Sequence, residues 1–381
     1  MSKVNLCDIC DFQGGSQPPK SQWITLQQDG YIRMLQIRDF TQPGKVKAEY
    51  VKLTNTTKCC LKDDILIARY GASLGKILTG LSGAYNVAMT KAVPNEAVIS
   101  KKFLYYFLCS DTFQNCILNV GVRAAQAGFN KEDLSNIELY CPDLSIQNKI
   151  CKILELVDVL INKSKLQLDE LDLLVKSRFI EMFGDPVSNP HKFTKVPLSE
   201  LADIKIGPFG SLLHKEDYIE NGNPVVNPSH IVNGNIVVDS RLTISNEKYE
   251  ELAAYKLEIG DVVLGRRGEM GRCAVVQKEG FLCGTGSVII RTKGEVTSDY
   301  IQQIISFPTF KRTIEDMAVG QTMPNLNVPI VSNFLITKPP VEIQKRYYDF
   351  VEQVDKSKLA IQKSLDELEI LKKSLMQQYF G

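Results

Sequence analysis

Two stretches of the chain repeat the same pattern of apolar and polar positions. Residues 146–184 align without a gap with residues 343–381, each 197 positions further on, and both copies open with Ile-Gln and close with Phe-Gly. Apolar residues recur at steps of three and four in both copies, at Ile146, Ile150, Leu154, Val157, Ile161, Leu168, Leu171 and Val175 and at Ile343, Tyr347, Val351, Val354, Ile361, Leu365, Leu368 and Leu375. These steps predict one amphipathic helix in each copy.

Both predicted helices are long, at roughly 35 to 40 residues, and a helix of that length extends beyond a single globular core. We therefore expect the two stripes to pack on each other as a coiled coil. Two ordinary amphipathic helices on separate cores are the alternative. Residues 142–145 offer capping side chains before the first helix, and Phe183-Gly184-Asp185-Pro186 provides a stop after it. The second helix follows Pro339-Pro340.

The repeat continues, more faintly, into the sequence before each helix. Lys102-Phe103 and Thr112-Phe113 lie 197 residues before Asp299-Tyr300 and Thr309-Phe310. Residues 63–66 precede residues 260–263 by the same interval. The repeating unit is therefore a globular domain followed by a helix.

Short β-branched runs between glycine and asparagine turns predict strands in both globular parts, at residues 64–68, 225–226, 236–238, 262–264 and 287–291. We expect an α+β fold. Its two similar globular domains would span residues 1–142 and 185–339, and its helices residues 143–184 and 340–381.

The repeat also predicts a geometry. A helix advances about 1.5 Å per residue, so ~38 residues separate the two globular domains by up to roughly 55 Å. To bury its stripe against the first helix, the second must run back toward the first domain, which makes the pair antiparallel. Such a tandem repeat is pseudo-twofold, as is duplex DNA, whose strands run in opposite directions. Because the domains diverge in sequence, we expect an asymmetric target in two parts.

This layout resembles the specificity subunits of Type I restriction-modification enzymes, in which two target-recognition domains alternate with two spacer helices. The resemblance covers essentially the whole chain. It rests first on the helices, each of which opens with Ile-Gln after a proline and closes with Phe-Gly. It also rests on residues 320–327, before the last strand of the second domain, and on the openings of the two domains at residues 6–16 and 198–211. The first domain departs from the pattern at residues 121–130, which contain no Pro-Asn.

The resemblance implies a non-catalytic chain that recognises double-stranded DNA in the cytoplasm. It implies two methyltransferase subunits as partners, which hold S-adenosylmethionine and methylate adenine at N6, and restriction subunits that translocate and cleave DNA with ATP and magnesium. The helices would set the spacing between the half-sites and dock the methyltransferase subunits. This chain itself would need no cofactor.

Composition fits this picture without adding to it. The net charge of +1 gives no overall nucleic-acid signature, so DNA contacts must come from local basic faces. The chain opens without a basic and apolar leader, and no apolar run is long enough to span a bilayer, which argues against secretion and membrane insertion. The ten cysteines follow no disulfide spacing and are expected to be reduced.

Base reading in the major groove uses arginine for guanine and amide side chains for adenine, while lysine and serine can hold phosphates. Such residues beside glycines are the candidate DNA contacts. In the first domain they are Lys20, Arg33, Gln36, Arg38, Arg69, Lys76, Arg123 and Gln126, with Arg38 and Arg69 favoured. In the second domain they are Ser211, His214, Lys215, Asn227, Ser229, His230, Arg266, Arg267, Arg272 and Gln321. Ordinary surface charges at strand ends are the alternative explanation of any one of them.

Signatures of catalysis are weak in this sequence. Asn189-Pro190 and Asn227-Pro228 do not complete the loop that an adenine methyltransferase needs, and residues 71–77 are interpreted as a tight turn instead of a phosphate loop. Cys7-x-x-Cys10 lacks a second pair, so packing is favoured over zinc. A coiled-coil protein scaffold without DNA specificity is the main alternative function, and a self-contained enzyme is the other.

Overall fold

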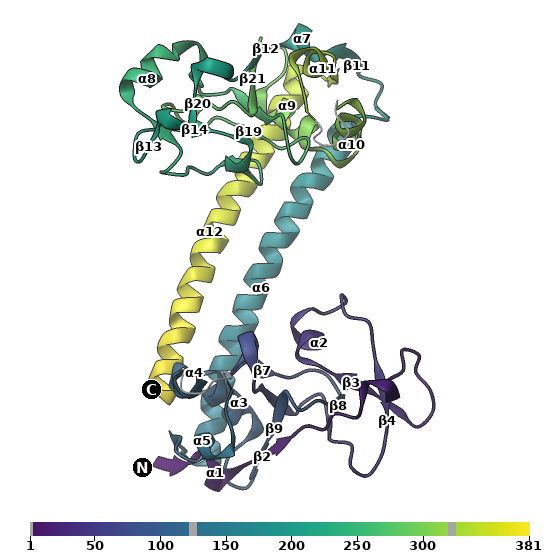
Figure 1. The fold of residues 1–381 in the computed structure, drawn as a ribbon, viewed down its shortest axis with the longest axis vertical. Helices are drawn as coiled ribbons and strands as arrows, with labels where there is room; N and C mark the ends of the chain where they lie inside the picture. Colours follow the sequence, from purple (N-terminus) through teal and green to yellow (C-terminus); the bar gives the residue numbers. More distant parts are fainter. Residues whose placement is uncertain (1–2, 122–127, 319–324) are drawn as a thin grey trace. The chain divides into compact units, whose positions relative to one another are not determined.

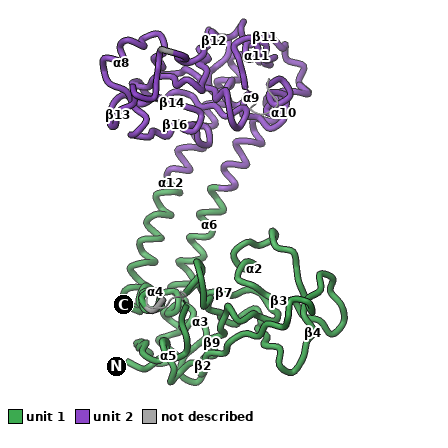
Figure 2. The backbone as a smooth tube through the Cα atoms, viewed as in Figure 1, with its two compact units in different colours: residues 1–168, 360–381 green, residues 169–359 purple. Residues whose placement is uncertain are grey.

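The computed structural model describes residues 3–121, 128–318 and 325–381. The chain forms two compact units: unit 1 contains residues 1–168 and 360–381, and unit 2 contains residues 169–359 (Figure 2). The long helices α6 (Leu144–Phe183) and α12 (Val341–Phe380) each contribute one part to each unit (Figure 1).

Unit 1 contains a strand pair and two four-stranded sheets. The pair joins β1 (Lys3–Asn5) to β10 (Glu138–Tyr140). The first sheet has the order β2 (Cys10–Gly14), β9 (Met89–Pro94), β6 (Ile65–Ala68), β7 (Ile77–Leu78). The second has the order β4 (Tyr50–Lys52), β3 (Tyr31–Leu35), β8 (Gly83–Tyr85), β5 (Cys59–Cys60), in which β3 and β8 are parallel. Its helices besides the long pair are α1 (Leu6–Ile9), α2 (Ile37–Thr41), α3 (Lys101–Cys109), α4 (Asp111–Gly121) and α5 (Lys131–Leu134).

Unit 2 is built in the same way. The pair joins β11 (Thr194–Pro197) to β22 (Leu335–Lys338). The first sheet has the order β12 (Ala202–Ile206), β21 (Ser287–Thr292), β18 (Val262–Gly265), β19 (Cys273–Val275), and the second has the order β13 (Tyr218–Ile219), β17 (Thr243–Ile244), β14 (Asn223–Val226), β20 (Leu282–Cys283). A hairpin of β15 (Ile231–Val232) and β16 (Asn235–Ile236) is added. The helices besides the long pair are α7 (Leu198–Leu201), α8 (Asn246–Glu251), α9 (Ser298–Ser306), α10 (Pro308–Met317) and α11 (Val328–Ser332).

The two units share their first sheet and differ in their second. The first sheets have corresponding strand orders, which we call the shared sheet. In the second sheets, the parallel pair is central in unit 1, where it is flanked by β4 and β5, but lies at one edge in unit 2. The expected α+β tandem repeat is therefore confirmed, and its divergence is concentrated in the second sheet.

In unit 1, α6 and α12 run antiparallel. The apolar seam contains Val157 and Ile161 of α6 and Leu365 of α12, all buried. Asp158 pairs with Lys372 at 2.6 Å, whereas Lys165, seven residues further along α6, pairs with Glu369 at 2.9 Å. Advancing along one helix thus means moving back along the other, as the sequence predicted.

The same holds in unit 2. Asp172 pairs with Lys358 at 2.5 Å, and further along α6 the ring of Phe179 packs 5.5 Å from that of Tyr347, which precedes Lys358 on α12. The stripes thus pack on each other at the seam, whereas Ile150 and Leu154 of α6 pack into the core of unit 1 and Tyr347 of α12 packs into the core of unit 2.

The repeated Phe-Gly has a packing role in each unit. Phe380 of α12 packs 5.0 Å from Phe103 in the core of unit 1, and its carbonyl accepts a hydrogen bond from the Thr112 hydroxyl at 2.6 Å. Phe183 of α6 packs 5.1 Å from Tyr300 in the core of unit 2. Gly184 then adopts φ +72°, the left-handed conformation that ends a helix, as expected.

The repeated Ile-Gln also has a structural explanation. Gln147 is fully buried: its Oε1 accepts from the backbone N–H of Ser100 at 2.8 Å, and its Nε2 donates to the carbonyls of Val98 at 2.8 Å and Pro142 at 2.7 Å. Gln344, 197 residues later, makes the corresponding bonds to Thr297 N at 3.0 Å and Pro339 O at 2.9 Å. Each glutamine fastens the start of a long helix to the domain before it.

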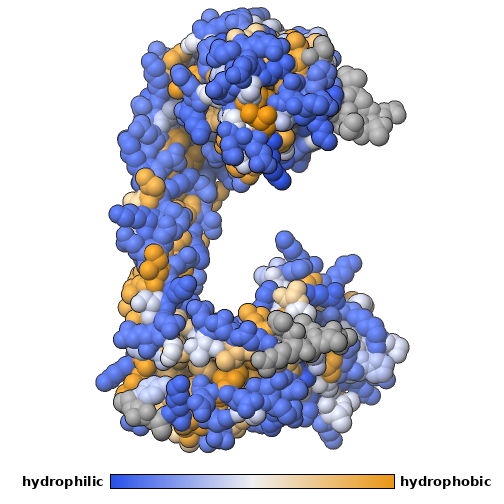
Figure 3. Space-filling model, turned by 60° about the vertical axis from the view of Figure 1, so that its left-hand side comes forward, coloured by the Kyte–Doolittle hydropathy of each residue, from blue (hydrophilic) through white to orange (hydrophobic). Residues whose placement is uncertain are grey.

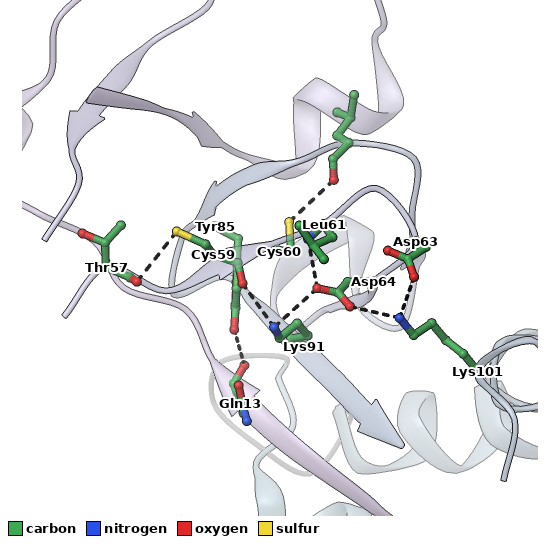
Figure 4. A network of polar contacts seen from close by, with 11 residues as sticks. Gln13, Thr57, Cys59, Cys60, Leu61, Asp63, Asp64, Tyr85, Lys91 and Lys101 are labelled. Atoms are coloured by element: carbon green, nitrogen blue, oxygen red, sulfur yellow. Dashed lines mark hydrogen bonds and ion pairs between the residues drawn. The ribbon is translucent and has the colours of Figure 1, made fainter. Parts of the chain in front are cut away.

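A polar network surrounds the start of β6 in the shared sheet of unit 1 (Figure 4). The Asp64 carboxylate at the start of β6 accepts from Lys91 Nζ and from Lys101 Nζ, both at 3.4 Å, and Lys101 also pairs with Asp63 at 2.7 Å. This ties β6 and β9 to α3. In unit 2 the counterpart Asp261 is buried and forms two 2.8 Å bonds with Arg291.

Most predicted strands are confirmed. The runs at residues 64–68, 225–226, 262–264 and 287–291 fall in β6, β14, β18 and β21. The strand predicted at residues 236–238 is wrong in its bounds, because β16 ends at Ile236 and the exposed Val237 and Val238 lie beyond it.

Candidate nucleic-acid interface

Arg69 and Arg266 occupy equivalent positions at the ends of the shared sheets. In unit 1 an Arg69 guanidinium nitrogen donates to the carbonyl of Phe129 at 3.5 Å. In unit 2 Arg266 Nε donates to the carbonyl of Leu326 at 2.9 Å. Both the arginines and the carbonyls are 197 residues apart. Each arginine therefore links β6 or β18 to the segment that returns toward the long helix, and each is only half-buried.

Glycine turns follow both arginines. Gly71 and Gly75 have φ of +71° and +80°, and the exposed Lys76 follows Gly75, which confirms that residues 71–77 form a tight turn. In unit 2 Gly268 and Gly271 have φ of +81° and +72°. The exposed Arg267 precedes this second turn, so basic side chains flank a glycine turn in each unit.

Arg272 closes the turn of unit 2. It pairs with Glu269 at 2.7 Å and also donates to the carbonyl of Pro228 at 3.3 Å. Lys311 reaches the same carboxylate at 3.2 Å. The hydrogen bond from Arg272 holds the pKa of Glu269 below its ordinary value, so this acid is charged at neutral pH.

The Pro228 turn gathers three further candidates in unit 2. This 3-10 turn, η5 (Pro228–His230), packs against Gly265 and Gly286 of the shared sheet region. Ser229 is exposed and Asn227 is half-buried. His230 is buried, and its Nδ1 lies 2.9 Å from the carbonyl of Val225, so its place in the fold is explained by closing its own turn.

In unit 1 four candidates meet around two carboxylates. Lys20, Gln36 and Arg38 contact the Glu49 carboxylate at 2.6, 3.0 and 3.2 Å, and Arg33 pairs with Asp39 at 2.5 Å. The Asp39 carboxylate also accepts from the backbone N–H of Gln36 at 2.8 Å, which joins the two groups. We call Lys20, Arg33, Gln36, Arg38, Asp39 and Glu49 the Glu49 cluster.

The Glu49 cluster lies on the second sheet of unit 1. Arg33 belongs to β3, Arg38 to α2, and Lys20 to the 3-10 turn η1 (Lys20–Gln22). Lys20 Nζ also lies 3.8 Å from the centre of the Trp23 ring. The hydrogen bond from Lys20 lowers the pKa of Glu49, which keeps its carboxylate ionised at neutral pH.

The other candidates are not joined to these groups by the contacts described. His214 and Lys215 are exposed beside the 3-10 turn η4 (Lys215–Asp217), where the His214 N–H donates to Asp217 at 2.6 Å. Ser211 lies in the turn η3 (Gly210–Leu212). Arg123, Gln126 and Gln321 lie outside the described residues.

Sequence reasoning missed the acidic members of these groups. Glu49, Asp39 and Glu269 are carboxylates, which do not belong to the donor types that fit guanine and phosphates. The 197-residue interval could have identified Arg69 and Arg266 as counterparts, since it already aligned the strands that precede them. No local pattern marks Glu49, whose partners come from residues 20 to 38.

The ten cysteines are all free thiols in the structure. Among residues 3–121, 128–318 and 325–381, no group of three or more histidine, cysteine or acidic side chains is arranged to hold a metal ion. In the same ranges, no helix has both the length and the apolar character needed to cross a bilayer.

A known protein family matches most of the chain. The family described as "Type I restriction modification DNA specificity domain" matches residues 1–170 and again residues 190–370. A Type I restriction enzyme MjaVIII specificity subunit of Methanocaldococcus jannaschii is 22% identical over 399 aligned residues, covering 98% of this chain and 90% of the relative.

Solved structures match the fold along the full length. A chain from a study of complex assembly and conformational transition in a type I restriction-modification system matches with a TM-score of 0.67 at 18% identity, covering 99% of this chain and 97% of that one. The specificity subunit of a Type I system from M. genitalium matches with a TM-score of 0.56 at 16% identity, covering 100% and 96%. At these levels of identity, the matches show that this chain shares its fold with these proteins.

Proposed function

The chain belongs to the Type I restriction-modification DNA specificity family, and on that premise we propose that it directs such an enzyme to a bipartite target in double-stranded DNA. The single observation that carries the proposal is the tandem repeat of the family domain on one chain. Each unit would read one half of the target. Because one polypeptide holds two related but different readers, the two half-sites need not be alike.

The division of each unit into a shared and a divergent sheet supports this proposal. Equivalent arginines, Arg69 and Arg266, lie directly after strands of the shared sheets, where a common task such as holding the DNA backbone is expected. The Glu49 cluster lies on the second sheet, which differs between the units. Arginine and glutamine there fit guanine and adenine, so this sheet is suited to carry the sequence preference.

The long helices would dock two methyltransferase subunits and set the distance between the half-sites. An exposed apolar stripe on α6 supports the docking role: Val159, Leu166, Leu173 and Ile180 recur every seven residues and are 61%, 57%, 63% and 51% exposed. Apolar side chains of this kind show as orange patches along the helices (Figure 3). Large exposed apolar side chains in a regular row are typical of a partner surface.

The chemistry would belong to the partners. The methyltransferase subunits would hold S-adenosylmethionine and modify adenine at N6, and restriction subunits would use ATP and magnesium to translocate and cleave DNA. This chain would supply only the target choice and needs no cofactor for that task. The chain with DNA and S-adenosylmethionine but without a partner should therefore transfer no methyl group.

The test is an exchange of residues 1–142 for the first domain of another specificity subunit, followed by sequencing of adenine methylation in cells that also express the methyltransferase subunit. We expect one half of the motif to change and the other to stay. A protein scaffold without DNA specificity predicts an unchanged motif. Methyl transfer by the purified chain alone would instead indicate a self-contained enzyme.

A further inference from the structure

The backbone at Glu49 is held in place by neighbouring segments of unit 1. Its carbonyl accepts from the N–H of Met34 on β3 at 2.8 Å. The next residue, Tyr50, pairs with Arg33 on one side and exchanges backbone hydrogen bonds of 2.8 and 3.0 Å with Ile24 on the other. The backbone of Glu49 is thus fixed between two neighbouring segments.

Two of the partners of Glu49, Lys20 and Arg38, are long and exposed. The side chains of Lys20 and Arg38 are 64% and 52% exposed, whereas that of Glu49 is 18% exposed. Long side chains of this kind sample many rotamers unless a contact restrains them. Convergence on one fixed carboxylate restrains the guanidinium of Arg38 and the amide of Gln36 together.

Restraint matters because base reading depends on orientation. An arginine distinguishes guanine, and a glutamine adenine, only when two parallel hydrogen bonds form to one base edge. Because its amide nitrogen donates one hydrogen to Glu49, the Gln36 side chain has a defined orientation, and the second amide hydrogen can still donate to a base.

We propose that Glu49 is a positioning residue that orients Gln36 and Arg38 and thereby determines base preference in one half-site. This inference rests on the proposed function, which it deepens. Glu49 acts through its neighbours and need not touch DNA itself.

The charge of Glu49 gives the proposal a second consequence. The Glu49 cluster contains three cationic side chains and two carboxylates. Neutralising Glu49 would free Arg38 and Lys20 to bind phosphates, which raises affinity for any DNA sequence. Loss of the carboxylate should therefore strengthen non-specific binding while it weakens discrimination, whereas a variant that merely unfolds the domain would weaken both.

The experiment uses the full chain assembled with the methyltransferase subunit of its system. Wild type, Glu49→Gln, Glu49→Asp and the control Asp11→Asn are each given a randomised duplex library and S-adenosylmethionine, and methylated sequences are read. Asp11 is a matched control, because it also pairs with a lysine of unit 1, Lys131, at 3.1 Å. The affinity for a non-cognate duplex is measured at salt concentrations from about 50 to about 200 mM, so that its dependence on salt can be determined.

For Glu49→Gln we expect discrimination at one or two positions to fall by about tenfold, the size of one base contact. The change should affect only the half-site that exchange of residues 1–142 alters. Non-cognate binding should become tighter, with a dependence of log affinity on log salt steeper by about one unit. Glu49→Asp should restore part of the discrimination, and Asp11→Asn should match wild type.

Three outcomes would overturn the inference. An unchanged motif in Glu49→Gln would mean that the carboxylate orients nothing that reads DNA. Loss of both discrimination and non-cognate binding, with a lower melting temperature, would mean a structural role alone. Wild type without any two-part motif would instead refute the proposed function, and this result is distinguishable because it does not depend on the variant.

Discussion

The free energy of unfolding of unit 1 should depend on Gln147, which connects the start of α6 to the first domain. The side chain is fully buried, and replacing it by alanine removes its hydrogen bonds to Ser100, Val98 and Pro142 and a weaker one to the Cys141 thiol. Each buried group left without a partner costs about 1 kcal/mol or more, so Gln147→Ala should destabilise unit 1 by roughly 3 kcal/mol. Ser100 also caps α3, so the loss should extend to the start of that helix.

The intrinsic fluorescence of Trp23 provides the assay. It is the sole tryptophan in the sequence and belongs to unit 1, so its urea transition follows that unit. With a slope of about 2 kcal/mol per molar urea, a loss of roughly 3 kcal/mol lowers the midpoint by about 1.5 M. The control Asn148→Ala changes the exposed neighbour and should stay within about 0.5 kcal/mol of wild type.

The variant Gln147→Glu tests the same hydrogen bonds through the pH dependence of its stability. In Gln147→Glu, burial should raise the folded-state pKa of the new carboxyl above about 4.3, its ordinary value. A carboxyl whose pKa is higher in the folded state than in the unfolded state stabilises the folded protein at pH values below its unfolded-state pKa. This contribution is lost as the pH rises through the folded-state pKa. The variant should therefore be less destabilised at pH 5 than at pH 8. A Gln147→Ala midpoint equal to that of Asn148→Ala would refute the role of these bonds.

Three further variants test the packing, the spacing and the docking surface. Phe380→Ala should destabilise unit 1 by about 3 to 5 kcal/mol, as measured by the Trp23 transition, while the exposed Gln378→Ala should not. Deleting residues 162–168 and 362–368 should shorten the helix pair by ~10 Å and the gap between half-motifs by about three base pairs; an unchanged gap would reject the spacing role. Leu166→Glu with Leu173→Glu should weaken methyltransferase binding at least about tenfold by calorimetry without lowering the melting temperature, and unaltered binding would exclude this stripe.

The long helices were predictable from sequence because their signal is local and repeated. Apolar residues at helical spacing, a glycine stop at Gly184 and the 197-residue interval all point to the same structure. The importance of Ile-Gln was visible as a recurring motif. Its reason was not, because the partners of Gln147 lie some 50 residues away at Val98 and Ser100, and only the fold brings them together.

The second sheets and the acidic residues were not predictable. The parallel pairing of β3 with β8 joins two short segments almost 50 residues apart, and short strands carry too little pattern to specify a partner. Among the candidate contacts, Lys20, Gln36 and Arg38 were identified by type alone, and their convergence on Glu49 emerges only when three segments meet. His230 shows the opposite case, since its ring is buried and contacts the carbonyl of Val225 on the preceding strand β14.

The most direct measurement is the adenine methylation motif that the full chain confers on its methyltransferase subunit, read by sequencing total DNA from cells that express both. The account predicts a target of two short, unlike half-motifs separated by a fixed gap of unspecified bases. A single uninterrupted motif, or methylation that does not depend on this chain, would contradict it.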